Sequence, residues 1–311
     1  MDGNLETQAM TVASNTPEYL SSLLAVGASM LRVSTPLVFA ALGGLASERA
    51  GVIMIALEGF MLLGAFAAAA VAAATGSAWL GLGTAAGAGA MFAAVYAVFA
   101  IRFRSDQIVA GTAINLLAVG ITPFLCKIFY GVTGSTPALA VEARFQTLPM
   151  FVAVGLVFVF WYWLDRTVSG SWVRFAGEKP EALDAAGLSV AKVRWGGVLL
   201  AGALAGLGGA SLSIFLSSSF SRGMTAGRGF MALAALIFGK WRPLPTALAC
   251  LLFGLADALQ MRLQGVVLWG TEPVPVQFIQ ILPYLLTMIV LAGFVGKSRA
   301  PKALGLPFPR V

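Results

Sequence analysis

The sequence contains no histidine and only two cysteines among its 311 residues. It therefore lacks the most common general base, proton relay and imidazole metal ligand. Cys126 and Cys250 both lie in apolar runs with no second cysteine nearby, so their spacing predicts neither a disulfide nor a metal site. We expect no metal, no cofactor and no catalytic residue in this chain.

Charged residues are also scarce. They make up 11% of the chain, against about 25% in soluble domains, while hydrophobic residues make up 59% and the mean hydropathy is +0.89. So few charges cannot cover a water-exposed surface, and the composition predicts an all-α polytopic membrane protein. The net charge of +7 does not indicate a nucleic-acid partner, because the basic residues gather at the ends of apolar runs.

Apolar runs of about 20 residues, the length that crosses a bilayer, occur eight times. They cover residues 20–45, 52–74, 78–101, 107–130, 148–165, 195–218, 243–263 and 276–296. Two stretches inside them, "GTAAG" (83–87) and "GALAGLGGA" (202–210), have the small-xxx-small spacing that predicts close helix–helix packing. A ninth segment, 222–240, has a short apolar core after a polar, Gly-rich stretch, which is typical of an interrupted helix. We expect about nine transmembrane helices in a membrane domain over 20–296, with an N-terminal segment 1–19 and a tail 297–311.

The basic residues predict the orientation. Arg102, Arg104 and Lys240 follow apolar runs and the tail 297–311 is basic, whereas residues 1–19 carry acidic but no basic side chains. Lys and Arg are enriched in cytoplasmic loops. We therefore expect the N-terminus outside the cell and the C-terminus in the cytoplasm.

A short sequence motif occurs twice. "GFMLLGA" (59–65) and "GFMALAA" (229–235) agree at five of seven positions, with Glu58 before the first copy and Arg228 before the second. In the predicted orientation the two copies run in opposite directions, which indicates an inverted internal repeat with interrupted helices at a transport pathway. Chance is the alternative for so short a match in a Gly/Ala-rich chain.

Four polar residues inside apolar runs are candidates for the translocation pathway: Glu58, Asn115, Arg228 and Asp257. Ionisable residues at membrane depth usually face the bundle interior or water. We predict that Glu58 and Arg228 pair where the interrupted helices meet, either to bind substrate or only to fix packing. For Asp257 a local pair with Arg262 is expected, and the amide of Asn115 suits a base edge or a sugar hydroxyl.

The longest polar stretch, 165–194, is predicted to be a cytoplasmic loop, and within it "KPEALDAAGL" (179–188) reads as a short helix. Pro180 suits the first helical position, Glu181 favours the positive N-terminal end, and Gly187 can adopt the left-handed stop. The helix has an alanine-rich surface on which a cytoplasmic partner could dock. A solvated connecting helix is the alternative.

The chain resembles a known family, the permease subunits of bacterial ABC importers for nucleosides and simple sugars. This family is related to the branched-chain amino acid and ribose permeases. The similarity is strongest to the short nucleoside-type branch and extends from about residue 30 to the C-terminus. It is carried by ordered blocks at 35–66, 105–120, 177–210, 224–244 and 282–305.

The resemblance implies that the short helix is the coupling helix that seats in a groove of the ATPase. The matching positions are Gly177, Glu178, Pro180, Glu181, Ala186 and Gly187, while Lys179 departs from the Asn that relatives commonly carry. It also implies a bacterial inner-membrane location, a second, longer permease, a cytoplasmic ABC ATPase and an extracytoplasmic substrate-binding protein. ATP hydrolysis is expected on that separate chain, because "ALIFGKW" (235–241) lacks the remainder of a phosphate-binding loop.

The implied function is translocation of a nucleoside, of purine type, delivered by the binding protein. The residue pattern alone indicates only a neutral, polar solute, because few charges lie along the candidate pathway. A permease for pentose or another simple sugar is one alternative. A self-sufficient secondary transporter or channel is another, but it leaves the alanine-rich helix unexplained.

Overall fold

The structure is a computed structural model that describes residues 3–263, 281, 285 and 299–308, with side chains from Leu24 onward. Its helices in chain order are α1 (Gly3–Arg49), α2 (Leu57–Thr75), α3 (Ala78–Ala97), α4 (Gln107–Tyr130), α5 (Leu148–Arg166), α6 (Val168–Glu178), α7 (Pro180–Ala185), α8 (Val190–Ser211), α9 (Arg228–Phe238) and α10 (Pro243–Leu263). Short π-helical turns extend α3 as η1 (Val98–Arg102) and α8 as η3 (Leu212–Leu216), and a 3-10 turn, η2 (Val141–Ala143), precedes α5.

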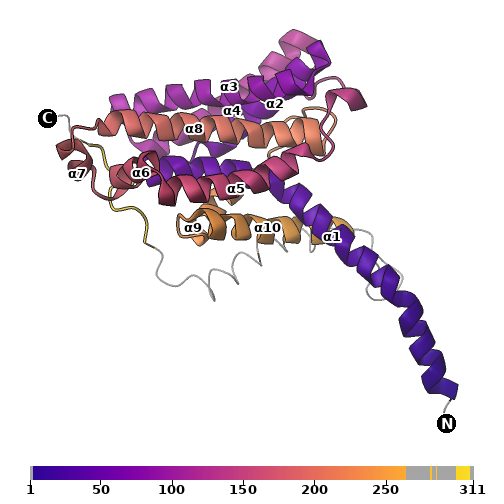
Figure 1. Ribbon diagram of the computed structural model, residues 1–311. Helices are drawn as coiled ribbons and strands as arrows, with labels where there is room; N and C mark the ends of the chain where they lie inside the picture. The colour runs from indigo at the N-terminus through magenta and orange to yellow at the C-terminus, as the bar shows by residue number, and fades with distance from the viewer. Residues whose placement is uncertain (1–2, 264–280, 282–284, 286–298, 309–311) are drawn as a thin grey trace.

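The described residues form an all-helical bundle, as predicted. Within the part of the chain that the structure describes, seven helices are long and apolar enough to cross a membrane: α1 from Leu24 onward, α2, α3, α4, α5, α8 and α10. They lie side by side, and the N-terminal part of α1 projects beyond the bundle (Figure 1). The predicted short, interrupted helix is α9, and the predicted span 276–296 falls almost entirely outside the described residues.

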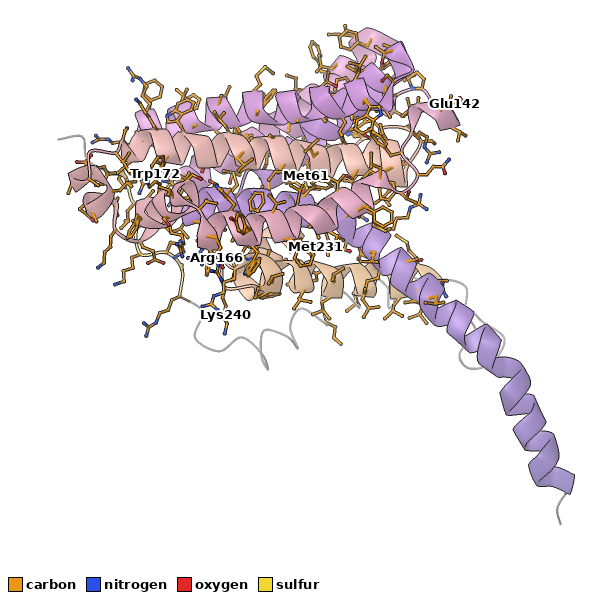
Figure 2. All side chains as sticks on the ribbon, viewed as in Figure 1. Met61, Glu142, Arg166, Trp172, Met231 and Lys240 are labelled. Carbon is orange, nitrogen blue, oxygen red and sulfur yellow. The ribbon has the colours of Figure 1, made fainter. Side chains whose placement is uncertain are left out.

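The two ends of the bundle differ. One end holds α6, α7 and the turn between α9 and α10, together with residues 299–308 (Figure 1), and Figure 2 shows Arg166 and Lys240 there. We call it the basic end. The opposite end carries Glu142 and the loop after α4, in which Thr136 and Leu139 pair through their backbone with the segment that follows η3.

Glycine allows the central helices to approach closely. α8 contacts α1, α2 and α3, and 78% of the most apolar stretch of α8 and η3 is buried inside the protein. A Cβ atom added at Gly64 of α2 would collide with the backbone of Gly206, and one at Gly89 of α3 would collide with that of Gly202. The small-residue packing predicted for 202–210 is therefore confirmed.

The same prediction for Gly83 and Gly87 is wrong, since a Cβ at either would meet nothing within 4 Å. The packing face of α3 lies two residues away, at Gly81, Ala85 and Gly89. Both sets recur every four residues, and two residues correspond to roughly 200° around a helix. Spacing alone therefore could not decide which face packs.

Gly206→Ala is expected to destabilise the bundle by about 2 kcal/mol, because the new methyl group would be forced into the backbone of Ala85. Gly87→Ala is the matched control: it makes the same change in open space, and we expect no loss. Thermal unfolding of the purified protein in detergent measures both. Equal unfolding temperatures for the two variants would contradict this packing.

The bundle contains the predicted inverted arrangement. α1 is followed by the irregular segment 50–56 and then α2, and α8 with η3 is followed by the irregular segment 217–227 and then α9. α1 and α8 pack together and run in opposite directions, as do α2 and α9 (Figure 1). The repeated sequence motifs thus lie in the first turns of two helices, α2 and α9, that run in opposite directions. Figure 2 shows their methionines, Met61 and Met231, between the two ends of the bundle.

Candidate functional site

The carboxylate of Glu58 caps the start of α9. Glu58 lies in the first turn of α2, where its Oε1 accepts a hydrogen bond from the amide N of Gly227 at 2.9 Å and its Oε2 accepts one from Gly229 at 2.7 Å. The first amides of a helix have no partner within it, and the N-terminus carries positive dipole charge. One carboxylate thus satisfies two of these donors and joins the starts of both interrupted helices.

Glycine is required on both sides of Arg228 for this contact. Gly227 has φ +82°, a left-handed conformation that other residues adopt at a cost. A Cβ at Gly229 would collide with the backbone of Glu58. The "GRG" triplet is therefore the sequence signature of the cap, although nothing in it points to a carboxylate 170 residues upstream.

Asn115 provides hydrogen-bond partners for the backbone at the start of α2, the other interrupted helix. From α4 its Oδ1 accepts a hydrogen bond from the amide N of Gly59 at 2.8 Å, and its Nδ2 donates to the carbonyl of Ile55 at 3.0 Å. Asn115 is buried, so both ends of its amide are already engaged. In this conformation it binds the irregular backbone before α2 and the first turn of that helix.

Two further side chains that sequence reasoning missed support the same segment. The Oε1 of Gln107 accepts from the amide N of Ile53 at 2.8 Å, and the hydroxyl of Tyr96 donates to the carbonyl of Ile53. Irregular backbone at membrane depth persists only where its polar groups have partners. A tyrosine and a glutamine inside apolar runs were the available signal.

The predicted Glu58–Arg228 pair is wrong. The guanidinium of Arg228 instead lies beside Asp257 of α10, with Nη2 3.8 Å from Oδ2, and its Nη1 donates to the carbonyl of Met224. The reason is geometric: the carboxylate takes the amides on either side of Arg228, and the side chain leaves the helix in another direction. The predicted Asp257–Arg262 pair is also not formed, since residues five apart do not face each other on a helix.

The Arg228–Asp257 pair is largely removed from solvent, with 21% and 13% of the two side chains exposed. Arg228→Met or Asp257→Asn alone is expected to destabilise the protein by about 2–3 kcal/mol, because each leaves one charge without its partner. The double variant should recover most of that loss. Thermal unfolding measures it, with Arg262→Met, exposed near the end of α10, as control; additive losses in the double variant would show that the two side chains act independently.

At the basic end, α7 has the predicted boundaries. Pro180 is its first residue, and Gly187, with φ +79°, ends it in the left-handed conformation. The amide of Leu188 donates to the carbonyl of Leu183, whose side chain is buried against Ala176. These local bonds make α7 a defined short helix and not a flexible loop.

The six predicted coupling positions divide into two groups. Glu181, Ala186 and Gly187 are exposed, on the face of α7 turned away from the bundle. Gly177 and Pro180 are buried, and a Cβ at Gly177 would collide with the carbonyl of Arg49. Glu178 lies between the two groups, with Oε1 3.8 Å from Nη1 of Arg49. The first group and the partly exposed side chain of Glu178 are therefore at the surface.

The family model described as "Branched-chain amino acid transport system / permease component" matches residues 27–291. The chain belongs to this permease family.

Three curated relatives resemble the permease over most of its length. It is 38% identical to the nucleoside ABC transporter permease protein NupC of Lactococcus lactis subsp. cremoris, over 93% of this chain and 98% of that protein. It is also 38% identical to the guanosine ABC transporter permease protein NupQ of Bacillus subtilis, over 88% and 93% of the two chains. The putative glucose ABC transporter permease protein TsgC13 of Haloferax volcanii is 35% identical to the permease, over 87% of this chain and 91% of that protein. No solved structure matches the permease.

Within the permease, the four candidate pathway residues thus all lie at contacts between helices. Glu58 and Asn115 hold the starts of α9 and α2, and Arg228 with Asp257 joins α9 to α10. All four are engaged within the protein in this conformation. Of these contacts, the hydrogen bonds of Glu58 are the ones that link α2 to α9.

Proposed function

We propose that the chain is the permease subunit of an ABC importer that translocates a nucleoside, of purine type. A separate cytoplasmic ATPase supplies the energy, and an extracytoplasmic binding protein delivers the solute. The observation that carries the transport part is the cap of α9 by Glu58, which joins two opposed, interrupted helices inside the bundle. Helices of this kind commonly form the binding and gating region of transporters.

The nucleoside part is supported by the relatives and by the charges of the site. NupC and NupQ are named for nucleoside and guanosine transport. Arg228 and Asp257 lie beside each other as an ion pair, and both carboxylate oxygens of Glu58 accept backbone hydrogen bonds, so these three charged groups are already engaged inside the permease. A neutral solute with many hydrogen-bonding groups, such as a nucleoside, fits this arrangement.

The partners and the orientation belong to the same proposal. The basic end faces the cytoplasm of a bacterial inner membrane, because Lys and Arg are retained there, and the N-terminus lies outside. The exposed face of α7 then meets the ATPase, which explains why alanines and Gly187 are exposed on it. A second, longer permease completes the pathway as a heterodimer.

Uptake by the purified complex in lipid vesicles tests the proposal. With the binding protein present, labelled guanosine should enter only when ATP is supplied, and adenosine and inosine should compete. Competition by glucose or ribose in their place would support a sugar permease, the second candidate that the similarity to TsgC13 favours. Uptake by this chain alone, without an ATPase, would overturn the proposal in favour of a secondary transporter or channel.

A further inference from the structure

The end of α1 is bonded to both interrupted helices through Glu48. This residue is only 3% exposed. Its Oε2 accepts a hydrogen bond from the indole Nε1 of Trp241 at 2.6 Å, and its Oε1 accepts from the amide N of Met54 at 3.3 Å. Met54 lies in the irregular segment before α2, and Trp241 lies in the turn that follows α9.

The next residue, Arg49, connects the same turn to the segment that carries α7. Its Nε donates to the carbonyl of Trp241 at 2.7 Å, and its Nη1 lies 3.8 Å from the carboxylate of Glu178, the last residue of α6. Arg49 is therefore in contact with one residue that precedes α7 and one that follows α9.

The turn between α9 and α10 is tight and strained. Lys240 and Trp241 have φ +53° and +54°, a left-handed conformation that costs non-glycine residues about 1 kcal/mol or more each. A Cβ at Gly239 would collide with Thr246 of α10. The bonds to Glu48 and Arg49 hold this strained turn, so a displacement at Trp241 is passed to α9 and not absorbed by a slack loop.

We infer that Glu48, Arg49 and Trp241 are positioning residues that transmit movement of the α6–α7 segment to both interrupted helices. Movement of α6 reaches Trp241 through Arg49 and then follows α9 to the Glu58 cap, about 16 Å away for its 11 residues. Glu48 ties the segment before α2 to the same turn. The inference rests on the proposed function, because only an ATP-driven permease has hydrolysis to couple to transport.

The rival explanation is that these bonds only anchor the α6–α7 segment. That segment has other attachments: the amide of Ala303 donates to the carbonyl of Gly177 at 2.8 Å, and Nη2 of Arg194 donates to the carbonyl of Ala176 at 3.5 Å. The segment therefore remains attached when Arg49 is changed. The two explanations differ in the ATP hydrolysed per molecule transported, which anchoring alone leaves unchanged in assembled complexes.

The test uses the full complex with its binding protein in vesicles and measures labelled guanosine uptake and ATP hydrolysis together. Trp241→Phe removes the indole donor and keeps an aromatic ring, and Arg49→Met removes the bonds to Trp241 and Glu178. Each variant is expected to raise the ATP consumed per guanosine at least about fivefold, since one lost charge-assisted hydrogen bond shifts an equilibrium by about that factor or more. Arg49→Lys, which restores the charge at one contact, should fall between.

Lys240→Gln is the matched control. Lys240 lies beside Trp241 in the same turn with the same backbone conformation, but its side chain is exposed (Figure 2). Its ratio of ATP to guanosine should equal that of the unmodified permease. If Arg49→Met does not assemble, Trp241→Phe and Arg49→Lys decide the question.

An unchanged ratio in the assembled variants overturns this inference while leaving the proposed function intact. Absence of ATP-dependent guanosine uptake by the unmodified complex is the different outcome that overturns the proposed function itself.

Discussion

Glu58→Ala is expected to lower ATP-dependent uptake by about thirtyfold or more. The change removes the acceptor of two amide hydrogen bonds, from Gly227 and Gly229, at the start of a helix within the membrane domain. A buried donor left without a partner costs about 1–3 kcal/mol, so two of them correspond to at least about 2 kcal/mol and up to about 6. Water that entered to replace the carboxylate would separate the starts of α2 and α9.

Two variants sharpen this experiment. Glu58→Gln keeps one acceptor oxygen and loses the negative charge that favours a helix N-terminus, so its uptake should be intermediate. Glu142→Ala removes an exposed carboxylate at the opposite end from α7 and should leave uptake unchanged (Figure 2). Uptake assays on complexes of verified assembly measure all three, and normal uptake by Glu58→Ala would show that the cap has no part in transport.

The comparison of Glu58 with α7 shows where sequence reasoning succeeded. The boundaries of α7 were predictable, because Pro180 and Gly187 set them through local backbone preferences. That Glu58 would have a partner inside the bundle was also predictable, since a carboxylate in an apolar run needs one. Its partner was not, because the sequence shows side chains, whereas Glu58 binds backbone amides that every residue type except proline carries.

Other contacts depend on the tertiary arrangement in the same way. Glu48 and Trp241 are separated by 193 positions, and neither is unusual in its local sequence. Gly83 and Gly87 have the same spacing as the glycines that do pack, but they lie on the other face of α3. Apolar runs and caps therefore predicted the helices, while the contacts between them required the structure.

Ala186→Arg is expected to lower uptake by about thirtyfold or more. Ala186 is exposed at the end of α7, on the face proposed to meet the ATPase. A long, charged side chain in the middle of a close-packed interface prevents the approach of the partner, and single interface changes of this kind cost about 2–4 kcal/mol or more. A cation near the C-terminal end of a helix is itself favourable, so the loss cannot be attributed to unfolding of α7.

The control for Ala186→Arg is Ala138→Arg, the same substitution at an exposed alanine in the loop after α4, at the opposite end of the bundle. Both variants should accumulate in the membrane and unfold at the same temperature as the unmodified permease. Only Ala186→Arg should lose the ATPase when the permease is purified from membranes, and with it the ATP-dependent uptake. If Ala186→Arg retains the ATPase, the exposed face of α7 is not the coupling surface, and the alanines there cover a solvated connection.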